Sequence, residues 1–153
     1  MGTYPADRHR GGLPAGRLPA LLAAGFLAAV SAGGVSGASA RVPLQDDPTI
    51  ENGLVIVAIG DAIRDNCGAI SPKFFRAYRF ARRLYNRARK LGYDHDEIEA
   101  YLDSNPDKAR VKGKARAYLE TRGVVADDPE TYCTAGLAEI ESKSQIGVLL
   151  KAK

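Results

Sequence analysis

The chain has 153 residues, with 22 Lys and Arg against 18 Asp and Glu, and only two Cys and two His. It contains no Gly-x-Ser-x-Gly elbow, no His-Glu-x-x-His pair and no phosphate-binding P-loop. The serine hydrolases, zinc proteases and P-loop enzymes that these motifs mark are therefore excluded. We expect no catalytic residue, no metal and no cofactor.

Residues 1–40 have the layout of a secretory signal peptide. A basic stretch precedes an apolar run over residues 18–30, and a small-residue tail ends in an Ala-x-Ala sequence at Ala40. The run is diluted by Ala, Gly and Ser, which makes it a poor membrane-spanning helix. We predict cleavage after Ala40 and a periplasmic or secreted protein. A weaker cut after Ala32 and an uncleaved anchor remain as alternatives.

Cleavage would change the charge of the protein. The first forty residues contain three Arg and one Asp, so 19 Lys and Arg would remain against 17 acidic residues. The remaining chain is one domain's worth of sequence and nearly balanced in charge. Nucleic acid is therefore an unlikely partner, because its recognition needs a domain-level excess of positive charge gathered on one face.

The exported part begins with residues 41–49, which contain two prolines and no periodicity and are predicted to be an extended lead-in. Thr49 is a plausible N-cap for a first helix over residues 50–66. Isoleucines recur in this segment at spacings of three and four, which predicts the central helix of the fold. Gly60 in its middle indicates either a close crossing with another helix or simple tolerance.

The second helix is predicted over residues 71–91, with Ser71 as N-cap and Pro72 at the first helical position. Gly92 follows its last residue and should end it. Aromatic residues on this helix and the later ones have the spacing of core residues, and we expect them to pack inside with their hydroxyls at the rim. These residues are Phe74, Phe75, Tyr78, Tyr85, Tyr101, Tyr118 and Tyr132.

Three further helices follow. Asp94 and Glu97 form a capping-box pattern at the start of the third helix. The fourth helix is predicted over about residues 106–122. Asp128, followed by a proline, begins the fifth helix. No segment shows convincing strand alternation. The predicted fold class is therefore all-α, a single small domain of about five helices over residues 50–153.

The two cysteines, Cys67 and Cys133, both lie in the exported part of the chain. Oxidising machinery outside the cytoplasm would pair them, joining the end of the first helix to the start of the fifth. The chain entropy of the closed loop gives roughly 4 kcal/mol of stabilisation. A metal site or a reactive thiol is the alternative, although His95 alone cannot complete a standard zinc site with them. We predict a disulfide.

The second helix also carries a row of basic residues at spacings of three and four, opposite its aromatic stripe. We call it the basic edge, and its members are Arg76, Arg79, Arg83, Arg87 and Lys90. No acidic residue of the same helix neutralises it. Such an edge could hold an acidic protein partner, an anionic membrane surface or a nucleic-acid backbone, whereas a solvated polar face is the plainer interpretation.

Two other clusters of charged residues need no functional interpretation. The fourth helix has basic residues at every second position, which spreads them around its surface, and we expect them to be solvated: Lys108, Arg110, Lys112, Lys114 and Arg116. Asp94, His95 and Asp96 could bind a metal, but an exposed helix cap is the better interpretation. Asp96 and Glu120 could flank a glycosidic bond if the fold brought them together.

Several short motifs together resemble one protein family. They are the segment from Gly53-Leu54 to Asn66-Cys67, the break at Leu91-Gly92-Tyr93 before Glu97-Ile98-Glu99-Ala100-Tyr101, the stop at Arg122-Gly123-Val124, and Asp128-Pro129-Glu130-Thr131-Tyr132-Cys133. They resemble a family of short exported bacterial proteins described only as a domain of unknown function, family number 5333. The resemblance covers nearly all of the exported part and carries over no catalytic residue. It implies that the gene lies near the genes of the respiratory NADH:quinone oxidoreductase. An accessory role at an energy-converting membrane would follow.

The leading functional hypothesis is a non-enzymatic periplasmic accessory or interaction protein. It would use the basic edge against an acidic protein partner or an anionic membrane surface, beside a respiratory membrane complex. The alternative is an exported hydrolase directed at the cell wall. A carrier of an apolar ligand is a third hypothesis, which would need a pocket.

Overall fold

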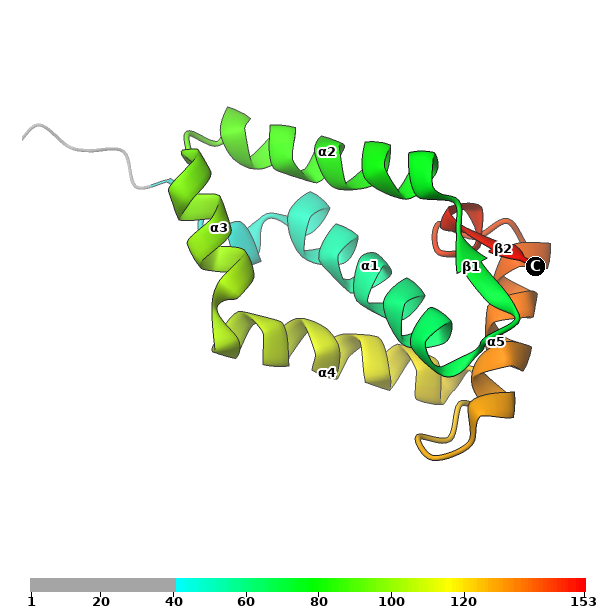
Figure 1. The fold of residues 1–153 in the computed structure, drawn as a ribbon. Helices are drawn as coiled ribbons and strands as arrows, with labels where there is room; N and C mark the ends of the chain where they lie inside the picture. Colours follow the sequence, from blue (N-terminus) through cyan, green and yellow to red (C-terminus); the bar gives the residue numbers. More distant parts are fainter. Residues whose placement is uncertain (1–40) are drawn as a thin grey trace, which may run out of the picture. The chain divides into compact units, whose positions relative to one another are not determined.

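The computed structural model describes residues 41–153, so the predicted signal peptide lies outside the described residues. Five α-helices dominate this part of the chain, as predicted, together with two short 3₁₀ helices and one two-stranded sheet (Figure 1). The elements in chain order are η1 (Leu44–Asp46), α1 (Pro48–Asn66), β1 (Ile70–Pro72), α2 (Phe74–Lys90), α3 (His95–Asp103), α4 (Asn105–Thr121), α5 (Pro129–Glu141), η2 (Gly147–Leu149) and β2 (Leu150–Ala152). Within residues 41–153, no helix combines the length and the apolar character that crossing a membrane requires.

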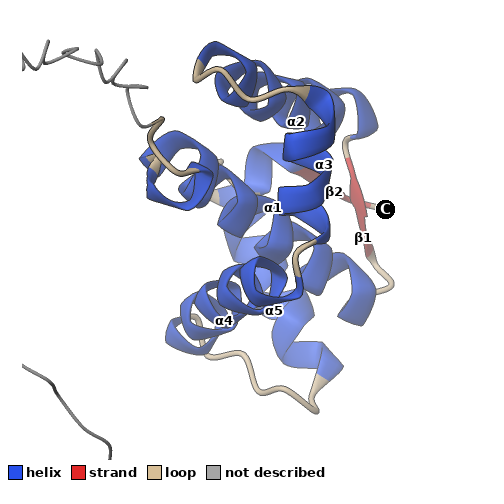
Figure 2. Cartoon of the chain, turned by 90° about the vertical axis from the view of Figure 1, so that its left-hand side faces the viewer, coloured by secondary structure: helices blue, strands red, loops and turns tan. Residues whose placement is uncertain are grey.

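The central element is α1. It runs between α2 and α4, which lie on opposite sides of it in both views, while α3 links α2 to α4 and α5 packs at the far end (Figures 1 and 2). The main core surrounds Ile59 and Ile63 of α1 and includes Leu119 of α4 and Ala135 of α5. A smaller core joins the start of α1 to α2 and α3. Its buried residues are Leu44, Ile50, Ala88 and Ile98.

The start of α1 differs from the prediction. Its N-cap is Asp47, whose side chain accepts hydrogen bonds from the backbone N–H groups of Thr49 and Ile50, each at 3.1 Å. Thr49 was therefore the wrong N-cap. Pro48 occupies the first helical position, where its missing N–H group would have no intrahelical partner. The segment predicted to be extended also contains the 3₁₀ helix η1.

The start of α2 was also predicted wrongly. Ser71 and Pro72 lie in β1, which pairs antiparallel with β2 so that Ser71 faces Lys151. The helix begins at Phe74, and Lys73 at the N-cap position makes no side-chain capping bond. Pairing with the distant end of the chain overrides the local start signal, and a strand of three residues is too short to show alternation.

The predicted caps of α3 and α5 and the glycines that end α2 and α4 are confirmed. Asp94 and Glu97 form the complete capping box of α3, and the Asp128 side chain caps α5. Gly92 and Gly123 follow α2 and α4 with φ values of 90° and 79°, a conformation that favours glycine.

The predicted disulfide is present. Cys67, directly after α1, is bonded to Cys133 of α5, with 5.1 Å between their Cα atoms. Both partners pack within the main core. Another close approach occurs beside the bridge, because a Cβ atom on Gly136 would lie 2.5 Å from side-chain atoms of Ile63 and Ile70. The disulfide thus lies where Gly136 allows α5 to pack closely against α1 and β1.

Candidate functional site on the second helix

The basic edge lies on the outward side of α2. The helix buries Leu84 and Ala88 against the rest of the domain, and all five members of the edge are exposed. Two further exposed arginines, Arg82 and Arg89, widen the cationic surface beyond the row that spacing alone identified. The helix has no acidic residue, so its positive charge can only be neutralised from other elements.

One member of the edge has such a partner. Arg87 donates to Oδ2 of Asp47 through Nη2 at 2.7 Å and through Nε at 3.0 Å. Asp47 is buried and caps α1, and the hydrogen bonds from Arg87 hold its pKa below the ordinary value. Arg87 therefore ties α2 to the start of α1 and serves a structural purpose.

The other four members differ from Arg87. Arg76, Arg79, Arg83 and Lys90 form no ion pair with any residue among 41–153. Like charges on one edge repel each other, and this repulsion is not relieved by the described part of the chain. These four residues are the available part of the basic edge.

The aromatic residues at the start of α2 contradict the sequence expectation. Phe74 is 70% exposed, Phe75 is 80% exposed and Tyr78 is 55% exposed. We call these three residues the aromatic tip. Successive residues of a helix are about 100° apart, so the two neighbouring phenylalanines could not both face one core. The adjacent pair was a signal that the sequence interpretation missed. The remaining tyrosines are partly buried, as expected: Tyr85, Tyr101, Tyr118 and Tyr132.

The surroundings of the aromatic tip are cationic. A hollow lined by Phe74 and Phe75 has four charged residues in its wall, all of them basic: Lys73, Arg76, Arg79 and Lys151. Phe74 and Tyr78 also line an apolar groove of about 300 Å³ between α2 and α1. This end of α2 therefore combines exposed apolar rings with positive charge. No carboxylate of residues 41–153 lines the hollow.

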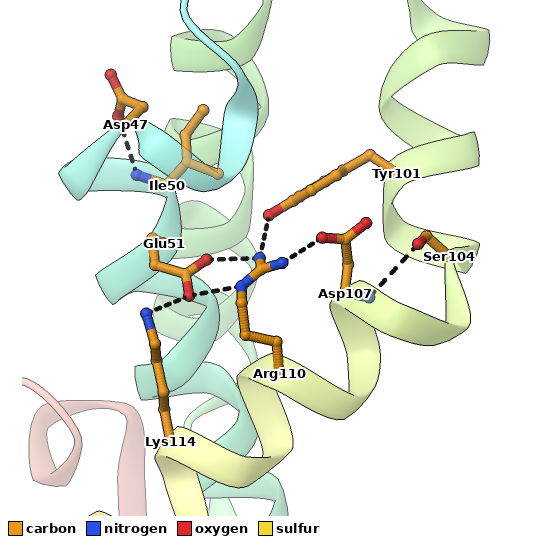
Figure 3. Close-up of polar contacts among 8 residues, drawn as sticks. All are labelled: Asp47, Ile50, Glu51, Tyr101, Ser104, Asp107, Arg110 and Lys114. Carbon is orange, nitrogen blue, oxygen red and sulfur yellow. Dashed lines mark hydrogen bonds and ion pairs between the residues drawn. The ribbon is translucent and has the colours of Figure 1, made fainter.

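The second basic cluster, on α4, is arranged differently. Glu51 of α1 is buried and accepts hydrogen bonds from Nη2 of Arg110 at 2.9 Å and Nζ of Lys114 at 2.8 Å (Figure 3). Arg110 also donates to the Tyr101 hydroxyl at 2.9 Å and pairs with Asp107. The expectation that this whole cluster is merely solvated is wrong for Arg110 and Lys114, which join α4 to α1 and α3.

A third buried carboxylate joins α4 to α5. Oε1 of Glu139 accepts a hydrogen bond from the Tyr118 hydroxyl at 2.6 Å and lies 3.4 Å from Nε of Arg122. Burial, together with this hydrogen bond to Glu139, raises the pKa of Tyr118. Oε2 of Glu139 has no hydrogen-bond partner in the described part of the chain. The arrangement is a contact between helices in the interior.

The residues considered for metal binding or glycoside hydrolysis are not assembled into a site. Asp94 caps α3, and His95 lies 3.3 Å from Glu99 one helical turn along. Residues 41–153 contain no group of three or more His, Cys, Asp or Glu side chains that could hold a metal ion. Asp96 lies at the start of α3, and Glu120 lies near the end of α4 that is opposite its junction with α3.

The fold and the surface define a small disulfide-bridged helical domain with a cationic second helix and an aromatic tip. Residues 42–151 match a family of unknown function (DUF5333), and the chain belongs to this family. Comparisons with curated proteins and with solved structures found no match.

Proposed function

We propose that the protein is a non-enzymatic exported accessory protein that binds an anionic partner surface through the available part of the basic edge. The observation that carries the proposal is the contrast in pairing on α2. Arg87 is neutralised by Asp47, whereas Arg76, Arg79 and Arg83 are exposed without an ionic partner among residues 41–153. Unneutralised charge along one helix face raises the local concentration of an oppositely charged partner and speeds its association.

Two further points support the setting. The disulfide between Cys67 and Cys133 fits a protein that folds in an oxidising compartment such as the periplasm. The resemblance of the sequence motifs to their family implies a place beside a respiratory membrane complex, and we include that place in the proposal.

A crosslinking pull-down tests the proposal. The protein, expressed from its full coding sequence, is crosslinked in the envelope fraction at low and at high salt. We expect salt-sensitive recovery of an envelope protein or of anionic phospholipid, and we expect an Arg79→Glu, Arg83→Glu double variant to lose it. The matched control is Lys112→Glu with Arg116→Glu, which changes the net charge equally at exposed positions of α4.

The control separates a specific edge from general electrostatic attraction. Loss of recovery in the α2 variant alone supports binding through the basic edge. Equal recovery by the wild-type protein and the α2 variant would overturn it, and equal loss in both variants would show that only net charge matters.

A further inference from the structure

The aromatic tip is unexplained by the packing of the fold. Phe75 precedes Leu84 by nine residues, about two and a half helical turns, so it lies on the side of α2 opposite the buried face. Phe74 is exposed as well, and its nearest aromatic neighbour is Phe75, with 5.8 Å between the ring centroids. No rotation of α2 could bury Phe75 while keeping Leu84 inside. The packing of the domain therefore does not account for the exposed ring of Phe75.

The charge around the tip is arranged on the same side. Arg79 and Arg82 follow Phe75 by four and seven residues, which places them on its face of the helix. Lys151 of β2 adds positive charge beside Phe74 and Phe75 from a different element. A partner that contacts the rings must accept several guanidinium and ammonium groups within the same small area.

We propose that this partner is an anionic phospholipid bilayer, with the aromatic tip inserted among the head groups and the neighbouring arginines on the lipid phosphates. The inference deepens the function proposed above and rests on it, because it names the anionic surface that the basic edge binds. Apolar rings beside basic side chains are typical of protein segments that lie in the membrane interface. Each basic residue close to an anionic bilayer adds to the attraction.

The shape of the tip favours a bilayer over a protein. Rings that are 70% and 80% exposed project from the surface, and a protein would need a preformed pocket to enclose them. A bilayer interface accepts projecting rings at a depth of roughly 5–10 Å without such a pocket. Attachment through inserted rings and phosphate contacts is peripheral and reversible.

Vesicle binding tests the proposal directly. The protein is sedimented with vesicles of equal parts phosphatidylcholine and phosphatidylglycerol, and separately with vesicles of phosphatidylcholine alone. We expect partition into the anionic vesicles only, weakened by added salt. A Phe74→Ala, Phe75→Ala double variant should lower the partition coefficient by roughly tenfold or more, because the inserted rings supply the apolar part of the binding.

The matched control removes apolar side chains that are exposed elsewhere. Val125 lies in the loop before α5 and Leu137 lies on α5, and both are about half exposed. A Val125→Ala, Leu137→Ala double variant should bind vesicles as the wild-type protein does. Equal losses in the two double variants would indicate nonspecific adhesion and would overturn the proposal.

A spectroscopic probe reports insertion itself. The chain has no Trp, so Phe75→Trp introduces a single tryptophan at the tip and Leu137→Trp introduces one on α5 as the control. We expect a blue shift of the tip tryptophan and quenching by brominated lipid, with no change at position 137. An unchanged spectrum of Phe75→Trp in the presence of anionic vesicles would refute insertion.

The outcomes distinguish this inference from the broader proposal. If the protein ignores anionic vesicles but the basic edge recovers a protein partner in the crosslinking experiment, the bilayer inference fails and the proposed function stands. If vesicle binding occurs but is the same in the Arg79→Glu, Arg83→Glu variant, the tip binds without the edge and the proposed function fails.

Discussion

The helices α2 and α4 are both rich in basic residues, yet they use them in different ways. On α4, Arg110 and Lys114 are paired with the buried Glu51, and Lys108 is paired with Asp103. On α2, Arg87 has an ionic partner, whereas the other members of the basic edge have none within residues 41–153. Arg110 and Lys114 thus tie α4 to α1, whereas most of the basic edge on α2 is available for binding. The two helices differ in whether a carboxylate of another element lies within reach of their basic residues. The amino-acid composition does not show this difference.

The largest expected effect comes from breaking the α4 network at its centre. Glu51→Gln keeps the shape of the side chain but leaves Arg110 and Lys114 without their buried carboxylate. We expect a loss of about 2–3 kcal/mol in the free energy of unfolding, at the lower end for a broken buried pair because Arg110 is partly exposed. Urea denaturation measures it, and Arg79→Gln on α2 is the control, expected within about 0.5 kcal/mol of wild type. Similar effects of both substitutions would remove the contrast between the two helices.

A second substitution examines how α2 is attached to α1. A Cβ atom on Gly53 would lie 2.4 Å from Cδ2 of Leu84, so α2 meets α1 through a close glycine contact. Gly53→Ala should lower the free energy of unfolding by about 1 kcal/mol, because the buried Leu84 side chain must move away from the new methyl group.

Gly60 of the same helix supplies the matched control. The nearest atom to a Cβ there is Cδ2 of Leu150 at 3.9 Å, an ordinary contact, so the close crossing allowed for at Gly60 occurs at Gly53 instead. Gly60→Ala should raise the free energy of unfolding by about 0.5–1 kcal/mol through helix propensity. Opposite signs for the two substitutions in thermal unfolding would support the packing argument, and equal signs would contradict it.

Acid should weaken the same α4 network. Hydrogen bonds from Arg110 and Lys114 hold the pKa of Glu51 below its ordinary value of 4.5, with burial acting in the opposite direction. A carboxylate whose folded pKa lies below its unfolded pKa stabilises the fold above the unfolded value, and this stabilisation is lost as the pH falls through the folded value. The free energy of unfolding should therefore fall below about pH 5. The decline should be shallower in Glu51→Gln, and identical pH profiles would rule out this contribution of Glu51.

Local sequence signals predicted the helices well where the signal and its partner are close in the chain. The capping box of Asp94 and Glu97 and the Asp128 cap each involve residues within one helical turn, and the structure has both. The disulfide was also predictable, because two cysteines in a chain predicted to be exported allow one pairing. The start of α2 was not, since Ser71 pairs with Lys151 at the other end of the chain.

The candidate site was only partly predictable for the same reason. Helical spacing identified the basic edge, but not that Arg87 would meet Asp47 forty residues earlier. Spacing also placed Phe74 and Tyr78 in the core, whereas Leu84 and Ala88 set the buried face. Which face of a helix is buried depends on the elements that pack against it, and those elements are distant in the sequence.

A loss of stability smaller than that of Glu51→Gln should separate the structural charge of α2 from the available ones. Arg87→Gln removes the guanidinium from the buried Asp47, which keeps its two backbone hydrogen bonds as the N-cap of α1. We expect a loss of about 1 kcal/mol in the free energy of unfolding, because Arg87 is itself partly exposed to water. Arg83→Gln, one turn earlier, should leave stability unchanged but weaken binding to anionic vesicles more than Arg87→Gln does. The reverse pattern in the two measurements would mean that Arg87 binds the partner and that its pairing with Asp47 contributes nothing to the fold.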